Sequence, residues 1–180
     1  MWLEPILRWI HILAGVMWIG LLWFFNFVNT DATKLAAASG EAAPIGKYIV
    51  PRALFFFRWS ALATWVFGAA LLSTVSVNGL NGFSGAFAFW QWGMHPAFAA
   101  IGMGAWLGTI MLFNVWALIW RNQKKILGFV PATDAEKARA RRVSGLASRV
   151  NTLLSIPMLF FMATGPHALF ISQNPEQIWH

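Results

Sequence analysis

The sequence predicts an all-α integral membrane protein: a four-helix bundle, up-down antiparallel, with both termini on the outer side of the membrane. Two observations predict it. Hydrophobic residues make up 58% of the 180-residue chain and charged residues only 11%, a balance outside the usual range of soluble domains. The apolar residues also gather in four runs of about 20 residues or more, the length of a membrane-crossing helix. We expect residues 1–180 to form one membrane domain.

The expected spans are 5–28, 49–75, 89–120 and 146–171. The apolar run of the first span is longer than the roughly 7–15 residues of a signal-peptide core and continues through Trp23, Phe24 and Phe25. We therefore expect it to remain in the mature protein. The connection 30–48 is alanine-rich with scattered charge, whereas 76–88 has Asn-Gly and glycine-rich turn signals and no charge.

The connection 121–145 carries the strongest topological signal. It is a basic loop with seven Lys and Arg residues against two acidic ones. Of the thirteen basic residues in the chain, only Arg8 lies away from the first and third connections. Because basic loops stay in the cytoplasm, we expect both termini outside, in a protein that crosses the bacterial inner (plasma) membrane several times.

The composition also excludes several kinds of chemistry. The chain has no cysteine, which excludes thiolate metal sites, iron–sulfur ligation and covalently attached c-type haem. The net charge of +7 does not indicate nucleic-acid binding, because the basic residues flank apolar spans and no soluble domain is long enough to present them. The expected partner of most of the surface is the lipid bilayer.

Three histidines fall at a similar expected depth, near the outer ends of three spans: His11, His95 and His167. Ionisable residues inside a membrane are costly and mark functional sites by default. Neutral imidazole binds haem iron, and histidines on two helices of a bundle can take both axial positions. We therefore expect haem b, with His11 and His167 as iron ligands and His95 as the alternative.

The spacing on the first span supports a flat ligand. His11, Gly15 and Trp18 lie on one helical face, so a gap lies between the imidazole and the indole. The third span repeats the order from His95 to Trp106. The alternative interpretation is close helix packing around hydrogen-bonded histidines.

A second set of polar residues lies near the inner ends of the spans. Asn26, Arg58, Asn114, Arg149 and Asn151 suggest a polar pocket for an anionic ligand, a quinone head group or a haem propionate. Hydrogen bonds between helices and snorkelling of the arginines are the alternative interpretation. At the outer end, Arg8 is expected to pair with a propionate or to snorkel.

The chain resembles the membrane domain of the bacterial urate oxidase, or urate hydroxylase, family in four stretches. They are RWIHILAGVMWIGLLWFFNFVN (8–29), FFFRWSALATWVFG (55–68), NVWALIWRNQKKIL (114–127) and RVNTLLSIPMLFFMATGPH (149–167). The resemblance implies an integral membrane redox protein, because longer members oxidise urate to 5-hydroxyisourate and pass electrons to a C-terminal cytochrome c domain. The following residues fall within the matching stretches: His11, His167, Arg58, Asn114, Gln123, Lys124 and Asn151.

The chain has no C-x-x-C-H motif, so we expect a short form that needs a separate electron acceptor, such as a cytochrome c. Its H-I-x-x-G-x-x-W-x-G element also resembles the first helix of small four-helix haem proteins related to membrane protoporphyrinogen oxidases. That second resemblance supports the haem interpretation independently of urate.

Two functions stay open at this point. The first is a haem b redox protein that transfers electrons, with urate or a related purine as its candidate substrate. The second is a non-catalytic accessory subunit whose aromatic helices pack against a larger respiratory or photosynthetic membrane complex. A channel or transporter is disfavoured, because the spans lack acidic residues.

Overall fold

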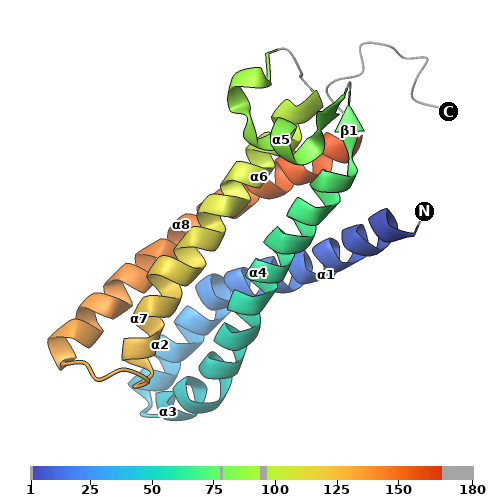
Figure 1. The fold of residues 1–180 in the computed structure, drawn as a ribbon. Helices are drawn as coiled ribbons and strands as arrows, with labels where there is room; N and C mark the ends of the chain where they lie inside the picture. The colour runs from blue at the N-terminus through green and yellow to red at the C-terminus, as the bar shows by residue number, and fades with distance from the viewer. Residues whose placement is uncertain (1, 78, 94–96, 168–180) are drawn as a thin grey trace.

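The computed structural model describes residues 2–77, 79–93 and 97–167. The predicted all-α class is confirmed, and four long helical stretches run in alternating directions (Figure 1). Their segments, in chain order, are α1 (Leu3–Trp23), η1 (Phe24–Asn29) and α2 (Thr30–Ala38); α3 (Ala42–Pro44), η2 (Ile45–Ile49) and α4 (Val50–Thr74); α6 (Ala97–Phe113), η4 (Asn114–Trp120) and α7 (Arg121–Ile126); and α8 (Asp134–His167).

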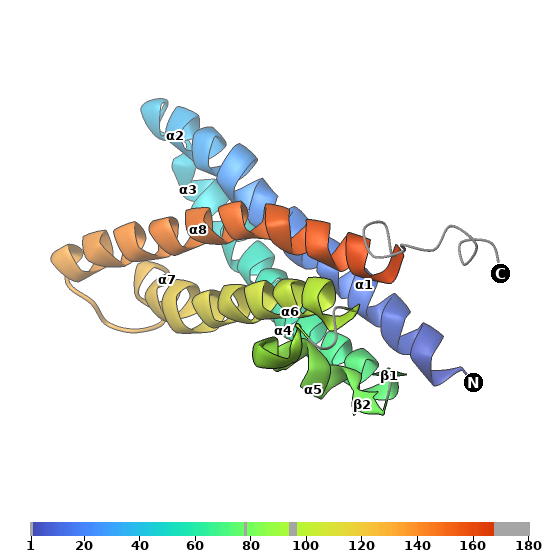
Figure 2. The same ribbon diagram turned by 90° about the horizontal axis from the view of Figure 1, so that it is seen from above.

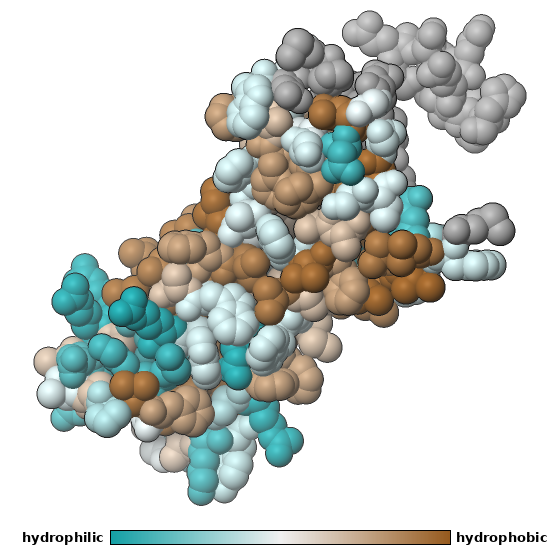
Figure 3. All heavy atoms as spheres, in the orientation of Figure 1, coloured by the Kyte–Doolittle hydropathy of each residue, from teal (hydrophilic) through white to brown (hydrophobic). Residues whose placement is uncertain are grey.

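Each stretch is long and apolar enough to cross a membrane. The protein is therefore a multi-pass membrane protein, as the sequence predicts. Figure 3 shows the corresponding surface, with hydrophobic residues over the middle of the molecule and hydrophilic residues gathered at the end formed by α2, α3, α7 and the start of α8. We call this the basic end. That it faces the cytoplasm stays a prediction from its charge.

The helices pack as two antiparallel pairs. α1 packs on α4, and α6 packs on α8. Seen from above, the first pair lies obliquely across the second (Figure 2). The core between the two helix pairs contains large, fully buried side chains: Trp18, Leu22, Phe57, Met111 and Val115. The bundle is thus held by burial of aromatic and branched side chains at one crossing point.

The end opposite the basic end differs from the expected one. The predicted span 89–120 begins later, because α6 starts at Ala97. Before it lie a hairpin of β1 (Ser76–Val77) and β2 (Leu80–Asn81), helix α5 (Gly82–Phe87) and the 3₁₀ turn η3 (Phe89–Gln91). Asn81 caps α5, since its side-chain oxygen accepts from the Phe83 N–H at 3.0 Å. Hydropathy alone does not separate such an apolar cap from a spanning helix.

The predicted basic loop 121–145 is mostly helical. α7 ends at Ile126. Gly128 follows with a φ of 80°, which suits glycine, and the Phe129 N–H donates back to the Lys124 carbonyl at 2.9 Å. α8 begins with a capping box. In it, Glu136 accepts from the Thr133 N–H at 2.8 Å, and the Thr133 hydroxyl accepts from the Glu136 N–H at 3.3 Å. Only 127–133 separates the two helices.

The third and fourth stretches are joined by buried amides. Asn114 Nδ2 donates to Asn151 Oδ1 at 2.8 Å, and Asn151 Nδ2 donates to the Met111 carbonyl at 3.0 Å. Asn151 is fully buried. The Met111 carbonyl belongs to the residue three positions before Asn114, where η4 begins and the helix widens into π geometry. A side chain inserted beside a helical ladder is a known cause of such distortion.

Asn151→Ala is expected to lower the free energy of unfolding by about 1–2 kcal/mol, because it leaves the Asn114 amide and the Met111 carbonyl unpaired. Asn122→Ala is the matched control, since Asn122 bonds only its own helix at the Leu118 carbonyl. Unfolding by a denaturing detergent, followed by circular dichroism, measures both. Equal losses in the two variants would contradict the assigned role of Asn151.

Candidate functional site

Of the three predicted haem-binding histidines, the structure describes the side chain of one. His95 lies outside the described residues. His167 is the last residue of α8, and its side chain lies outside the described part as well. His11 lies on α1, half-buried against α4. Its Nδ1 lies 2.8 Å from the Thr64 carbonyl oxygen.

This contact fixes the tautomer of His11. A carbonyl oxygen only accepts, so Nδ1 must carry the proton. In the neutral ring, Nε2 then holds a free lone pair, as in metal-bound histidines whose other N–H donates to a backbone carbonyl. Among the described residues, no group of three or more His, Asp or Glu could hold a metal ion. The bond to Thr64 therefore leaves Nε2 as the ring atom of His11 that is open to a further partner.

The residues expected to form a slot beside His11 are used for packing. A Cβ on Gly15 would lie 3.7 Å from the Thr64 methyl group of α4, so α4 covers this glycine. Trp18 is 2% exposed and lies in the core. Arg8 is exposed and pairs with Glu4 at 2.7 Å. These positions follow from the close approach of α1 to α4.

The structure separates the five residues of the predicted inner pocket into two pairs and Arg58. Asn114 and Asn151 bond each other in the core. Arg58 stacks on Trp120, with its guanidinium carbon 3.8 Å from the ring centroid. Asn26 and Arg149 line one cavity.

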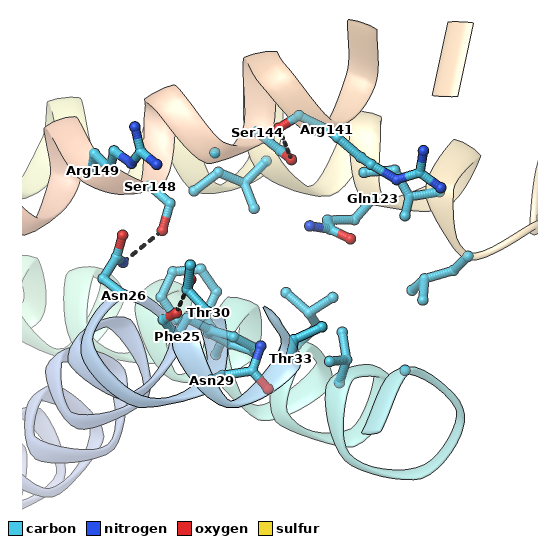
Figure 4. Close-up of a pocket in the computed structure, with 18 of the residues that line it drawn as sticks. Phe25, Asn26, Asn29, Thr30, Thr33, Gln123, Arg141, Ser144, Ser148 and Arg149 are labelled. Carbon is cyan, nitrogen blue, oxygen red and sulfur yellow. Dashed lines mark hydrogen bonds between the residues drawn. The ribbon is translucent and has the colours of Figure 1, made fainter. Parts of the chain in front are cut away.

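This cavity lies at the basic end and has a volume of about 760 Å³, within the usual range for small-molecule sites. Its floor is apolar and includes Phe25, Leu54, Phe57 and Ile119. Its walls are polar and come from η1, α2, α7 and α8 (Figure 4). The polar side chains are Asn26, Asn29, Thr30, Thr33, Lys34, Gln123, Arg141, Ser144, Ser148 and Arg149.

The charge in the cavity is positive. None of the described residues that line it is acidic. Lys34 is paired with Asp31 at 3.0 Å, but Arg141 and Arg149 form no ion pair within the described part of the chain. Both arginines are exposed at the rim. The cavity therefore suits an anion that also forms hydrogen bonds with amides and hydroxyls.

The two ends of the cavity differ in the hydrogen bonds of their side chains. At one end, Asn26 Nδ2 donates to Ser148 Oγ at 2.8 Å and ties η1 to α8 (Figure 4). At the other end, Gln123 of α7 and Arg141 of α8 line the cavity (Figure 4). The hydroxyl of Thr33 is buried and has no partner among the described residues. A buried polar atom of this kind is usually satisfied by water or a ligand.

The cavity is also where the helices deviate from α geometry. Three segments, η1, η2 and η4, are π-helical, and each contributes to the lining, through Phe25, Gly46 and Ile119 respectively. π-Helical residues are well under 1% of globular proteins and concentrate at functional sites. Sequence reasoning placed Arg149 among the inner polar residues and Gln123 in a family stretch. It missed Arg141 and did not join the three in one site, because only the fold brings α7 and α8 together.

Fold and site together define a class: a multi-pass membrane protein with a polar, positively charged ligand cavity at one end of its bundle. Within that class the chain belongs to the urate oxidase N-terminal family, whose model matches residues 80–179, in agreement with the resemblance seen in the sequence. No curated protein and no solved structure matches the chain.

Gly68 is expected to be intolerant of a side chain, because a Cβ there would lie 2.8 Å from the His11 ring. Gly68→Ala should displace the imidazole and destabilise the protein by about 1–3 kcal/mol, the usual effect of overpacking. Gly15→Ala, with its ordinary 3.7 Å contact, is the control and should be near neutral. The melting temperatures of both variants in detergent measure this. Similar melting temperatures of the Gly68→Ala and Gly15→Ala variants would contradict the close contact between the His11 ring and Gly68 on α4.

Proposed function

We propose that this protein is an integral membrane redox protein that oxidises urate, or a purine of similar shape and charge, bound in the cavity at the basic end. One observation carries the proposal: all four stretches that resemble the urate oxidase family line this cavity. They contribute Asn26 and Asn29, Phe57, Gln123, and Arg149 in turn. Residues far apart in sequence that share a family pattern and converge on one cavity support a common ligand.

The chemistry of urate matches the lining. Urate is a planar anion with ring N–H donors and carbonyl acceptors on its edges. Arg141 and Arg149 provide cations, Asn29 and Gln123 provide amides that donate and accept, and Phe57 provides an aromatic wall. The absence of an acidic side chain among the described lining residues removes a source of repulsion.

The reaction requires an electron acceptor. Oxidation of urate to 5-hydroxyisourate takes the oxygen atom of one water molecule and releases two protons and two electrons. A haem b would supply a one-electron redox centre when bound. His11 is the described residue that fits as its ligand, because the bond to Thr64 leaves Nε2 free. His95 or His167 would provide the second position, and a separate acceptor such as a cytochrome c would take the electrons onward.

Arg149→Gln and Arg141→Gln are each expected to weaken urate binding by about tenfold, the effect of one lost charge-assisted hydrogen bond. Arg142→Gln is the matched control, because Arg142 is exposed on the same helix and does not line the cavity. Calorimetry with purified protein measures binding without turnover. Equal affinity in all four proteins would contradict the substrate site.

The haem is tested separately. Protein purified in mild detergent should show the sharp reduced bands of a bis-histidine b-type haem after dithionite, and His11→Ala should lose them. Loss of the bands in Gly68→Ala as well is expected, since the imidazole must move. A folded, haem-supplemented wild type with a featureless spectrum would contradict haem binding. If that haem-free protein also copurified with a larger complex in stoichiometric amounts, the result would favour the accessory-subunit alternative.

A further inference from the structure

Arg58 is a charged residue that the proposed function does not use. It lies on α4, half-buried, and does not line the cavity. If the last 20 or so residues of α4 cross the hydrocarbon, Arg58 lies about one turn inside its basic end. A charge at this depth needs a partner, and such residues are functional candidates by default.

The surroundings of Arg58 are aromatic rather than acidic. Its guanidinium carbon lies 3.8 Å from the ring centroid of Trp120 on η4 and 5.2 Å from that of Phe55 on its own helix. None of the ion pairs in the described part of the chain includes Arg58, and no hydrogen bond of its side chain is found there. The cation is thus held by ring faces alone.

This arrangement leaves the hydrogen-bonding capacity of the guanidinium unused. Stacking engages the face of the group, whereas its five N–H donors lie in the plane and point outward from the edges. In-plane donor pairs match two oxygens of a phosphate. Stacking on Trp120 also restricts the side chain, so that less conformational entropy is lost on binding.

We propose that Arg58 and Trp120 form a binding site for the phosphate of an anionic phospholipid, on the outside of the bundle between α4 and η4. Phe55 is exposed and can contact the acyl chains beneath the headgroup. Charge complementarity favours an anionic lipid over a zwitterionic one, because the basic end of the molecule carries most of the Lys and Arg residues. This inference is independent of the cavity and of haem.

The test is lipid retention measured by native mass spectrometry. Purified protein is mixed with equimolar phosphatidylglycerol and phosphatidylcholine of identical acyl chains. Wild type should retain phosphatidylglycerol preferentially, and Arg58→Gln should lower that retention by about tenfold. Arg58→Lys keeps the charge but not the planar stack and should retain an intermediate amount. Arg52→Gln, which removes an exposed cation from the same helix, should behave as wild type.

A second pair of variants covers the case in which Arg58→Gln fails to fold. Trp120→Ala should lower retention, and Trp120→Phe, which keeps a ring, should restore most of it. Circular dichroism and gel filtration confirm the fold of each. Unchanged retention in Arg58→Gln, or equal losses in Arg52→Gln, would overturn the site. Displacement of the lipid by equimolar inorganic phosphate would also overturn it, since the site would then bind free phosphate rather than lipid.

Discussion

The hydrogen bonds from Asn114 to Asn151 and from Asn151 to the Met111 carbonyl are the interaction on which the basic end of the molecule depends. Inside a membrane a buried amide has no water to bond, so the two asparagines fix α8 against η4 in one register. Arg149 lies two residues from Asn151 along α8, and Gln123 lies beyond η4 on α7. Fixing the register therefore fixes which side chains face the cavity.

The two ends of the bundle have different chemistry. The basic end has a wide, polar cavity surrounded by π-helical turns and arginines. Toward the other end, α1 and α4 approach so closely that glycine is required at position 68, and His11 bonds a backbone carbonyl. The cavity at the basic end is open to a soluble anion from water. At the opposite end, a close helix contact holds the half-buried His11 ring against α4.

Sequence reasoning predicted the all-α class and the four membrane-crossing stretches, since hydropathy reports directly on the solvent around a helix. The connection expected at 76–88 contains the hairpin and α5, whereas η3, from Phe89 to Gln91, was expected inside a span because its neighbourhood is apolar. For Asn114 and Asn151 sequence reasoning offered a pocket or a hydrogen bond between helices, and the structure has the hydrogen bond. Spacing along one helix does not reveal which residue of the partner helix is bonded. Arg149 was expected among the inner polar residues and Arg141 only as topological charge. That both line one cavity with Gln123 depends on packing between helices.

The central claim is that the four family stretches meet at a purine site at the basic end. Hydrogen–deuterium exchange with and without saturating urate tests it most directly. The account predicts slower exchange on urate addition in the segments 24–29, 114–127 and 141–149, which enclose the cavity, and no change at 3–15 or 60–74. Protection confined to those last two segments, or absent from the whole chain, would contradict the account.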